Sequence, residues 1–423
     1  MSTRYREYVD SGAKWLGQLP AHWRLAPLGT HFDERSQIVS DTEFAPLSVT
    51  KDGVVPQMET VAKTDKNDTR KLVRAGDFAI NSRSDRKGSS GVSDRDGSVS
   101  LVYTVLTPRA GIDSRFLHHL LRSGAFQEEF YRWGNGIVAD LWSTRYSSMK
   151  RIPLALPPME EQRAIADFLD RETAKVDGLI GEQEGLVEVL RERRSAVITR
   201  AATRGVDGAP LVAVGDPHLA AVPGHWRMSR FGREMLVNAG QVDPREEPWV
   251  DMILVAPNHI QSGTGRIIGR QTAREQGADS GKYVVQAGQV LYSKIRPALN
   301  KVTVAVEDCL CSADMYALSS RTPGDARFAM YFMLARPFHT YATLQSLRVK
   351  MPKVNREELG AAPWVVPPIE EQSKIANYLD EQTAKIDALI AEAEGIVAVA
   401  KERRSALITA AVTGQFDVRG EVA

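Results

Sequence analysis

At 423 residues the chain is too long for one ordinary domain, and its composition, 43% hydrophobic and 25% charged, is that of a globular protein with a sizeable core. The mean hydropathy of −0.27 and the lack of any apolar run of about 20 residues argue against a membrane protein, and two cysteines are too few for a disulfide framework. The net charge of +1 excludes a strongly basic chain, although a balanced total can hide local asymmetry. We therefore expect a cytoplasmic protein that makes no contact with membranes.

The first part of the chain opens on a short element, LPAHWRLAPLG at residues 19–29, which returns as VPGHWRMSRFG at residues 222–232. Because the element recurs, its tryptophans are expected to anchor the first strand of each domain rather than to stack on nucleic acid. The sequence that follows has short β-branched and aromatic runs, such as SVSLVYTVLTP at 98–108, and then a helical pattern at 114–123. These patterns predict a mixed α and β domain over residues 1–156.

A second repeat begins at residue 157, where PPMEEQRAIADFLDRET matches PPIEEQSKIANYLDEQT from residue 367. The match runs without a gap to ERRSAVIT and ERRSALIT, and roughly three positions in five are identical over about 47 residues. The paired prolines and glutamates suit the first turn of a helix, and no proline follows for about 40 residues. Two long helices are predicted, one over 157–204 and the other within 367–423.

Both long helices fit a heptad register, in which mostly apolar residues are spaced by three and four, as knobs-into-holes packing requires. The other faces carry charge, so each helix needs a partner, and the sister copy is the nearest candidate. The alternative is a pair of unrelated surface helices, each packed on its own domain. The predicted pairing seam consists of Leu169, Val176, Ile180, Val187, Leu190 and Val197 in the first helix and of Leu379, Ile386, Ile390, Val397 and Leu407 in the second.

Between the two long helices, residues 205–366 again have a mixed pattern. Strands are predicted in KYVVQAGQVLYSKI at 282–295 and NKVTVAV at 300–306, and a helix is predicted near 327–338. The two variable stretches share little sequence beyond a strand-like element, GDFAINS from Gly76 and GQVLYSK from Gly288. The repeated helices have closely similar sequences, whereas the variable stretches have diverged. This pattern indicates that the two helices have the same function, while the two variable stretches have related but different functions.

Each variable stretch contains a polar or basic segment that is predicted to be a loop, NSRSDRKGSSGVSDRDG at 81–97 and SKIRPALNK at 293–301. Arginine can pair bidentately with guanine and asparagine with adenine, whereas lysine mainly holds phosphates. The alternative for each residue is an ordinary solvated loop. The candidate DNA-binding residues are Arg83, Arg86, Lys87 and Arg95 in the first segment and Lys294, Arg296, Asn300 and Lys301 in the second.

The opening YREYVDSGAKWLGQLPAHW at residues 5–23, the PPMEEQ and PPIEEQ helices and their ERRSAVIT and ERRSALIT ends resemble the specificity subunits of type I restriction–modification systems along the whole chain. The resemblance implies two target-recognition domains, 1–156 and 205–366, each reading one half of a bipartite, asymmetric site in double-stranded DNA. It also implies that the two spacer helices, 157–204 and 367–423, form an antiparallel coiled coil in a pseudo-two-fold α+β architecture. These helices would separate the domains and dock two modification (methyltransferase) subunits, and restriction subunits would join to cleave DNA.

The sequence lacks the motifs of the accompanying enzymes. We find no Asn-Pro-Pro-Tyr/Phe stretch of an amino-methyltransferase and no glycine-rich cofactor loop after a strand. A non-catalytic subunit without metal or cofactor is expected, with S-adenosylmethionine, ATP and Mg²⁺ on partner subunits only. Two alternatives stay open: the recognition part of a single-chain restriction–methylation enzyme, and a coiled-coil scaffold that does not bind DNA.

Overall fold

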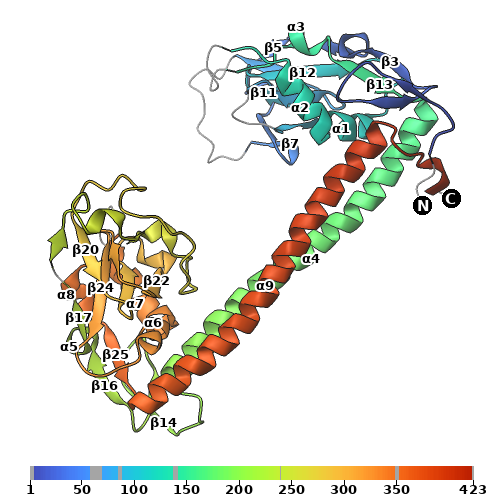
Figure 1. Ribbon diagram of the computed structural model, residues 1–423. Helices are drawn as coiled ribbons and strands as arrows, with labels where there is room; N and C mark the ends of the chain where they lie inside the picture. Colours follow the sequence, from blue (N-terminus) through green and yellow to red (C-terminus); the bar gives the residue numbers. More distant parts are fainter. Residues whose placement is uncertain are drawn as a thin grey trace. The chain divides into compact units, whose positions relative to one another are not determined.

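The computed structural model describes residues 4–57, 69–83, 88–136, 142–238, 240–347 and 352–421, and the chain divides into two compact units. The first unit comprises residues 1–183 and 395–423, and the second comprises residues 184–394. Both unit boundaries fall inside the long helices α4 (Met159–Arg204) and α9 (Ile369–Val412) (Figure 1). Each unit therefore holds the beginning of one long helix and the end of the other.

The first unit is built mainly of short strands. They are β1 (Tyr8–Asp10), β2 (Gln18–Pro20), β3 (Arg24–Pro27), β4 (Phe32–Glu34), β5 (Ile38–Val39), β6 (Leu47–Thr50), β7 (Gly53–Pro56), β8 (Arg70–Val73), β9 (Phe78–Asn81), β10 (Ser90–Val92), β11 (Gly97–Val99), β12 (Tyr103–Pro108) and β13 (Pro153–Leu156). One antiparallel sheet has the order β10-β9-β12-β4 and another β11-β8-β5, and β1–β2, β3–β13 and β6–β7 form pairs. The short helices are η1 (Leu28–Thr30), α1 (Ser114–Arg122), α2 (Gly124–Arg132), α3 (Tyr146–Met149) and η7 (Arg419–Glu421).

The second unit has a similar set of elements. Its strands are β14 (Leu211–Ala213), β15 (Ala221–Pro223), β16 (Arg227–Arg230), β17 (Met235–Val237), β18 (Gln241–Val242), β19 (Leu254–Val255), β20 (Lys282–Val285), β21 (Val290–Ser293), β22 (Val302–Val304), β23 (Cys309–Cys311), β24 (Met315–Ser320) and β25 (Pro363–Val366). They form sheets of order β17-β24-β21-β22 and β18-β20-β23-β19 and the pairs β14–β15 and β16–β25. The helices are α5 (Phe231–Glu234), η4 (Trp249–Asp251), η5 (Pro257–His259), η6 (Pro297–Leu299), α6 (Ala326–Leu334), α7 (Arg336–Ser346) and α8 (Arg356–Gly360).

The two units share one topology. The order β4-β12-β9-β10 of the first unit corresponds to β17-β24-β21-β22 of the second, and β5-β8-β11 corresponds to β18-β20-β23. The hairpin β1–β2 and the pair β3–β13 likewise correspond to β14–β15 and β16–β25. The units differ beside these sheets: the second has β19, which runs parallel to β23, and the first has the pair β6–β7 and a parallel bridge from Pro46 to Ser98 of β11. The strand pairing therefore shows that the two variable domains are structural repeats, although their sequences have diverged.

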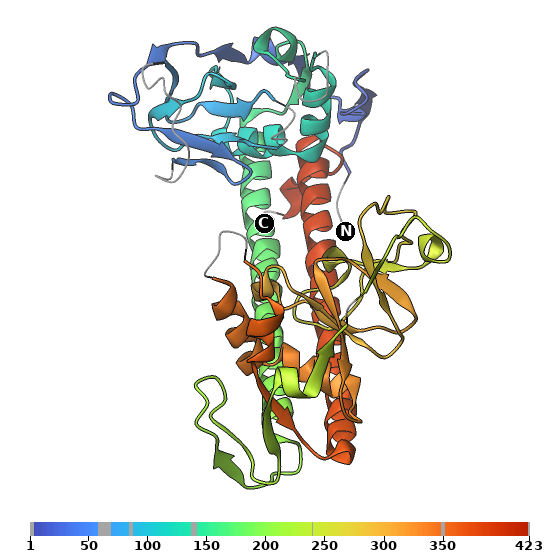
Figure 2. The same cartoon turned by 90° about the vertical axis from the view of Figure 1, so that its left-hand side faces the viewer.

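Within each unit the ends of α4 and α9 lie side by side and run in opposite directions (Figures 1 and 2). In the first unit Leu169 of α4 shares a core with Ala411 of α9, and in the second unit Ala201 of α4 shares a core with Leu379 of α9. This arrangement confirms the predicted α+β class, with two mixed domains and two long antiparallel helices. The helix pattern predicted near 327–338 is instead two helices that meet at Ala335, because a proline occupies the first turn of α7.

The predicted pairing-seam residues are all buried or partly buried. Leucines that lie off this seam, Leu179, Leu186 and Leu389, are instead exposed. Leu169 and Leu379 have no exposed surface and belong to the two domain cores as well as to the helix pair. No helix in the described part of the chain is long and apolar enough to cross a membrane.

Candidate nucleic-acid interface

The two segments predicted to contact DNA occupy the same place in the two units. Residues 82–89 join β9 to β10, and residues 294–301 join β21 to β22, with eight residues in each connection. We refer to them as the first and second hairpin loops. Each loop forms an isolated β-bridge with a later segment. Arg83 bridges to Ser143, just before α3, and Ile295 bridges to Lys353, just before α8. The strand register thus aligns two loops whose residues cannot be matched by sequence.

The first predicted segment, 81–97, is not a single loop. Its Ser90–Val92 part is strand β10, which pairs with β9, although glycine and serine have low strand propensity. Gly91 also permits the close approach of β7, because a Cβ atom there would lie 2.9 Å from the Cα atom of Gly53. Arg95 therefore belongs to the next turn, after β10, rather than to the first hairpin loop.

The residues predicted in the first unit differ in their surroundings. Arg83 is exposed, and its backbone N–H donates to Asn81 Oδ1 over 2.9 Å. Arg95 is exposed too, and its guanidinium donates to both carboxylate oxygens of Asp94 over 2.7 and 2.8 Å. This pairing raises the pKa of Arg95 and lowers that of Asp94. Arg86 and Lys87 lie outside the described residues.

In the second hairpin loop, polar side chains fasten the loop to its own domain. Asn300 is 9% exposed, and its side-chain amide donates to the Leu334 carbonyl over 3.0 Å. Lys301 Nζ donates to the Pro257 carbonyl over 2.6 Å, and Lys294 Nζ lies 5.5 Å from the ring centre of Tyr316. These contacts hold the loop in one shape and engage groups that are predicted to contact DNA.

Backbone strain marks the same loop. Arg296 and Asn300 both have a φ of 47°, in the left-handed region, where a residue other than glycine costs about 1–3 kcal/mol. The Arg296 backbone N–H is held by the Pro352 carbonyl over 2.8 Å, while its side chain is exposed. The loop thus presents the Arg296 guanidinium to solvent from a backbone that its neighbours fix.

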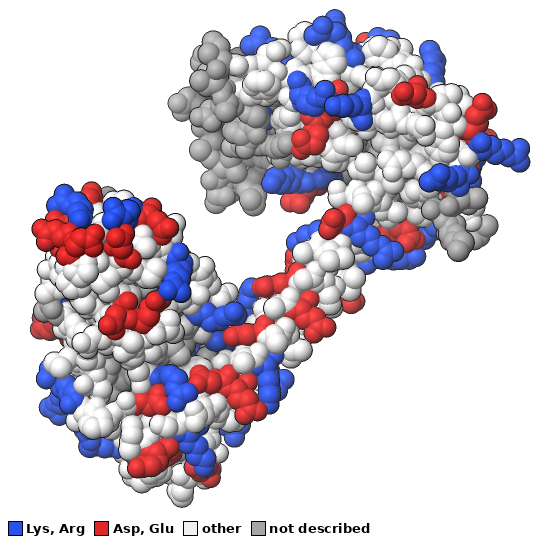
Figure 3. All heavy atoms as spheres, viewed as in Figure 1, with Lys and Arg blue, Asp and Glu red and all other residues white. Residues whose placement is uncertain are grey.

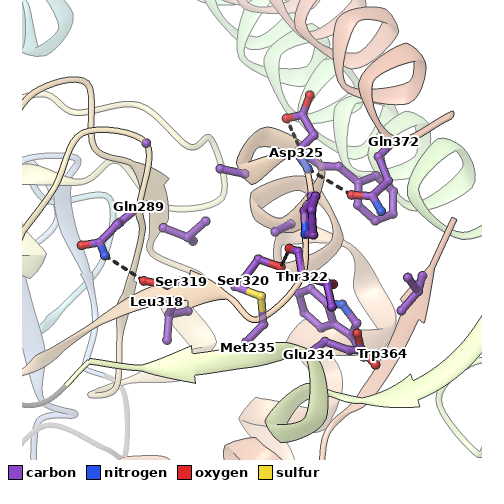
Figure 4. Close-up of a pocket in the computed structure, with 18 of the residues that line it drawn as sticks. Glu234, Met235, Gln289, Leu318, Ser319, Ser320, Thr322, Asp325, Trp364 and Gln372 are labelled. Atoms are coloured by element: carbon purple, nitrogen blue, oxygen red, sulfur yellow. Dashed lines mark hydrogen bonds between the residues drawn. The ribbon is translucent and has the colours of Figure 1, made fainter. Parts of the chain in front are cut away.

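The short helix that follows each sheet is docked on a long helix by the same contacts. Asp113 caps α1, and its backbone N–H donates to Gln162 Oε1 of α4 over 2.9 Å. Asp325 caps α6 and donates in the same way to Gln372 Oε1 of α9 over 3.1 Å (Figure 4). Sequence reasoning missed these residues. The repeated Asp-x-Arg-Phe at Asp113 and Asp325 is the signal that could have found them.

A carboxylate about two helical turns further along each long helix strengthens the docking. Asp170 of α4 lies 2.7 Å from His119 Nε2 and accepts from Arg115 over 3.2 Å. Its equivalent in α9, Asp380, accepts from Tyr331 and Arg327, each over 2.7 Å. The variable domains therefore carry a constant attachment to the long helices.

The repeated tryptophans join each domain to the start of a long helix. Trp23 is buried and donates to Glu161 over 2.9 Å, and His225 lies 2.8 Å from the equivalent Glu371. The tryptophans also cover the glycines that end the other long helix, Gly414 with φ 71° and Gly205 with φ 70°. Each tryptophan thus contacts a long helix end, and it directly precedes β3 or β16, which is not the first strand of its unit.

A cavity at the other end of the second unit's main sheet is unsuited to DNA. It has a volume of about 280 Å³ and is lined by carboxylates and by polar and apolar side chains, without lysine or arginine (Figure 4). Glu234 accepts two hydrogen bonds from Arg227, which lower the pKa of the carboxyl group. The cavity therefore offers no lysine or arginine side chain among its lining residues to bind a phosphate.

Comparison with known proteins gives relatives of one kind. The chain is 30% identical over 321 residues to the type I restriction enzyme EcoDI specificity subunit of Escherichia coli, covering 72% of this chain and 70% of that protein. It is 26% identical over 201 residues to the type I restriction enzyme EcoKI specificity subunit of Escherichia coli strain K12, covering 43% of each. No protein-family model matches the chain.

A solved structure has the same fold. That structure comes from work on complex assembly and conformational transition of the type I R-M system, and its TM-score with this chain is 0.68. The two share 18% identity, and the match covers 93% of this chain and 98% of that one. Identity this low supports a likeness of fold alone.

Proposed function

The chain belongs to the family of type I restriction enzyme specificity subunits, and we propose that it reads a bipartite DNA site, with each unit contacting one half. As a specificity subunit it is the non-catalytic, DNA-recognising member of its restriction–modification system. The observation that supports two half-sites is the repeated topology, which places unlike loops, SRSDRKGS and KIRPALNK, between equivalent strands. One scaffold with two different loops suits two different short sequences.

Within this proposal the exposed arginines of the hairpin loops contact base edges. Arg296 is the first choice, since its backbone is fixed and its exposed guanidinium, which has no hydrogen-bond partner among the described residues, can form a bidentate pair with guanine. Arg83 takes the corresponding role in the first unit, together with Arg86 and Lys87. Asn300 is assigned to holding the loop, because its amide is already bound inside the domain.

The partners follow from the same proposal. Two modification subunits dock on the long helices, restriction subunits complete the complex, and both kinds of enzyme chemistry, with S-adenosylmethionine, ATP and Mg²⁺, reside on those partners. The helix pair sets the distance between the half-sites. Such a complex works in the cytoplasm, where it meets DNA.

Domain exchange tests this function directly. Residues 24–156 are replaced by the corresponding segment of another such subunit, and the methylated sequence is mapped genome-wide in a host that supplies the modification subunits. One half-site should change while the other half-site and the spacer stay the same. The reciprocal exchange of residues 227–366 is the matched control and should alter only the other half. A change in both halves from either exchange would refute the division of labour.

A further inference from the structure

Each unit has a groove beside the C-terminal end of its hairpin loop, lined by two short helices, α1 and α2 or α6 and α7, and by the end of one long helix. The second groove is also lined by residues 260–268 and by residues 387–394 of α9. The first groove has a volume of about 430 Å³ and the second about 990 Å³. Gly88 of the first hairpin loop corresponds to Asn300 of the second, and both have positive φ values. At the long helices, Arg404 and Ile408 of α9 correspond to Arg194 and Ile198 of α4. The two grooves are therefore equivalent sites.

Both grooves are basic, although most of the residues that make them so differ. The first groove is lined by three cationic residues and one carboxylate, Glu128, and one of the three, Arg404, is paired with Asp177 of α4. The second groove is lined by five cationic residues and two carboxylates. The cationic residues are Lys51, Arg122 and Arg404 in the first groove and Arg191, Arg194, Arg266, Lys301 and Arg336 in the second. In a chain whose net charge is only +1, two such excesses at equivalent positions indicate a shared ligand of negative charge.

In the first groove the cationic charge is held in place by neutral groups. Arg122 donates to His118 Nε2 over 2.6 Å and to the Lys51 carbonyl. His118 can accept because burial and the neighbouring Arg122 lower its pKa to about 4, so that the ring is neutral at pH 7. Within the described ranges no carboxylate forms an ion pair with Arg122. The guanidinium is thus positioned without being neutralised.

In the second groove both carboxylates are already paired with arginines. Asp387 pairs with Arg194 over 2.8 Å and Glu394 with Arg191 over 2.9 Å. The side chains of Arg266 and Arg336 are exposed at the rim of the groove. Figure 3 shows lysine and arginine side chains where the long helices meet the second domain. An anion that enters the groove would meet these side chains with little competition.

We propose that each groove binds one backbone phosphate of the DNA half-site that its own unit reads. This inference rests on the proposed function, and it assigns the contacts that orient DNA rather than those that read bases. Phosphate contacts fix the register of a protein on the duplex without carrying sequence information. Residues that agree in charge but differ in identity suit such a role, whereas base reading would demand particular side chains.

The test uses the complete complex with two modification subunits on a duplex that carries the mapped site. Lys51→Gln in the first groove and Arg336→Gln in the second each remove one exposed cation. Lys14→Gln, between β1 and β2, and Arg321→Gln, at the far end of β24 from the hairpin loop, are matched controls at exposed positions. Affinity is measured at several salt concentrations. Each groove variant should reduce the slope of log Kd against log salt by about 0.9, the value for one phosphate, and leave the preferred sequence unchanged.

Duplexes with single methylphosphonates identify the phosphate. The wild-type complex should lose affinity at one neutralised position in each half-site, and the corresponding groove variant should lose nothing further there. Slopes for Lys51→Gln and Arg336→Gln that equal those of the controls would overturn the inference. A second outcome would also overturn it: the wild-type complex binds inorganic pyrophosphate, the two variants do not, and their DNA affinity is unchanged. The groove would then bind a free phosphate compound and not DNA. Lack of sequence-specific binding by the wild-type complex would instead contradict the proposed function itself.

Discussion

The two units fasten the long helices with equivalent arginines, but only one of these arginines is buried. Arg194 of α4 pairs with Asp387 of α9 and is 6% exposed, while Arg404 of α9 pairs with Asp177 of α4 and is 37% exposed. The difference comes from the variable domain. In the second unit the carbonyls of Gly263 and Thr264 accept hydrogen bonds from the remaining N–H groups of Arg194. Duplication has kept the ion pair, and the diverged domain decides how far it is shielded from water.

The tryptophan junctions differ in a similar way. Trp23 donates to Glu161, which also accepts from Tyr5 over 2.5 Å, and this contact and burial raise the pKa of Tyr5. The indole N–H of Trp226 is buried and has no acceptor among the residues that the structure describes. In the first unit the chain's own N-terminal segment supplies the additional donor. In the second unit His225 still contacts Glu371, but the indole of Trp226 is held by packing.

Replacing Arg194 or Arg404 should give the largest difference in stability between the two units. Arg194→Met leaves Asp387 and two carbonyls without their donor, so we expect the free energy of unfolding to fall by about 3–5 kcal/mol. Arg404→Met removes an exposed pair and should cost at most about 1 kcal/mol. Urea unfolding of the full chain, with amide hydrogen exchange to locate the loss, measures both. Equal losses in the two variants would mean that the loop over Arg194 adds nothing to the pair.

A second difference between the units is a histidine, His118 of α1, where α6 has Met330. The pKa of His118 is lowered from 6.5 to about 4 by burial and by the charges of Arg122 and Arg404, which outweigh the attraction of Asp170. As the pH falls, the unfolded chain takes up this proton first. His118 therefore costs stability progressively between about pH 6.5 and pH 4.

Replacing the histidine by its counterpart should remove that pH dependence. Because the interval between the two pKa values corresponds to at most about 3 kcal/mol, His118→Met should gain up to that amount relative to wild type on going from pH 8 to pH 4. His119, whose pKa is lowered as well, is present in both proteins, so the difference isolates His118. Unfolding curves at a series of pH values give the result. Parallel stability profiles for the two proteins would show that His118 titrates normally in the fold.

The sequence predicted the long helices well because their determinants are local. Heptad spacing, paired glutamates at the start and a long stretch without proline all lie within one segment, and the gapless repeat shows them twice. The compact units were not predictable from the same pattern. The repeat suggests borders where the helices begin, whereas each unit takes one end of both helices, which depends on contacts between residues more than 190 positions apart, such as Arg194 with Asp387.

The candidate site was predictable only in part, for the same reason. Composition located both hairpin loops, but it could not distinguish a side chain that reaches solvent from one that reaches its own backbone. Asn300 and Lys301 are bound by the carbonyls of Leu334 and Pro257, which lie 34 and 44 residues away. Arg296 differs from them only because no such acceptor was found for its exposed side chain in the described structure. That distinction is set by tertiary packing and leaves no mark in the loop sequence.

The smallest predicted difference concerns the helices themselves. α4 has Gly181 where α9 has Ala391, and a Cβ atom added at Gly181 would meet no atom within 4 Å. Gly181→Ala should therefore raise the free energy of unfolding by about 0.8–1 kcal/mol, because alanine loses less backbone entropy than glycine on forming a helix. The reverse change in the exposed α9 position, Ala391→Gly, should lower it by a similar amount, as measured by thermal unfolding of the full chain. If neither change alters the free energy of unfolding, the helix propensity of these positions does not contribute to the stability of the folded chain.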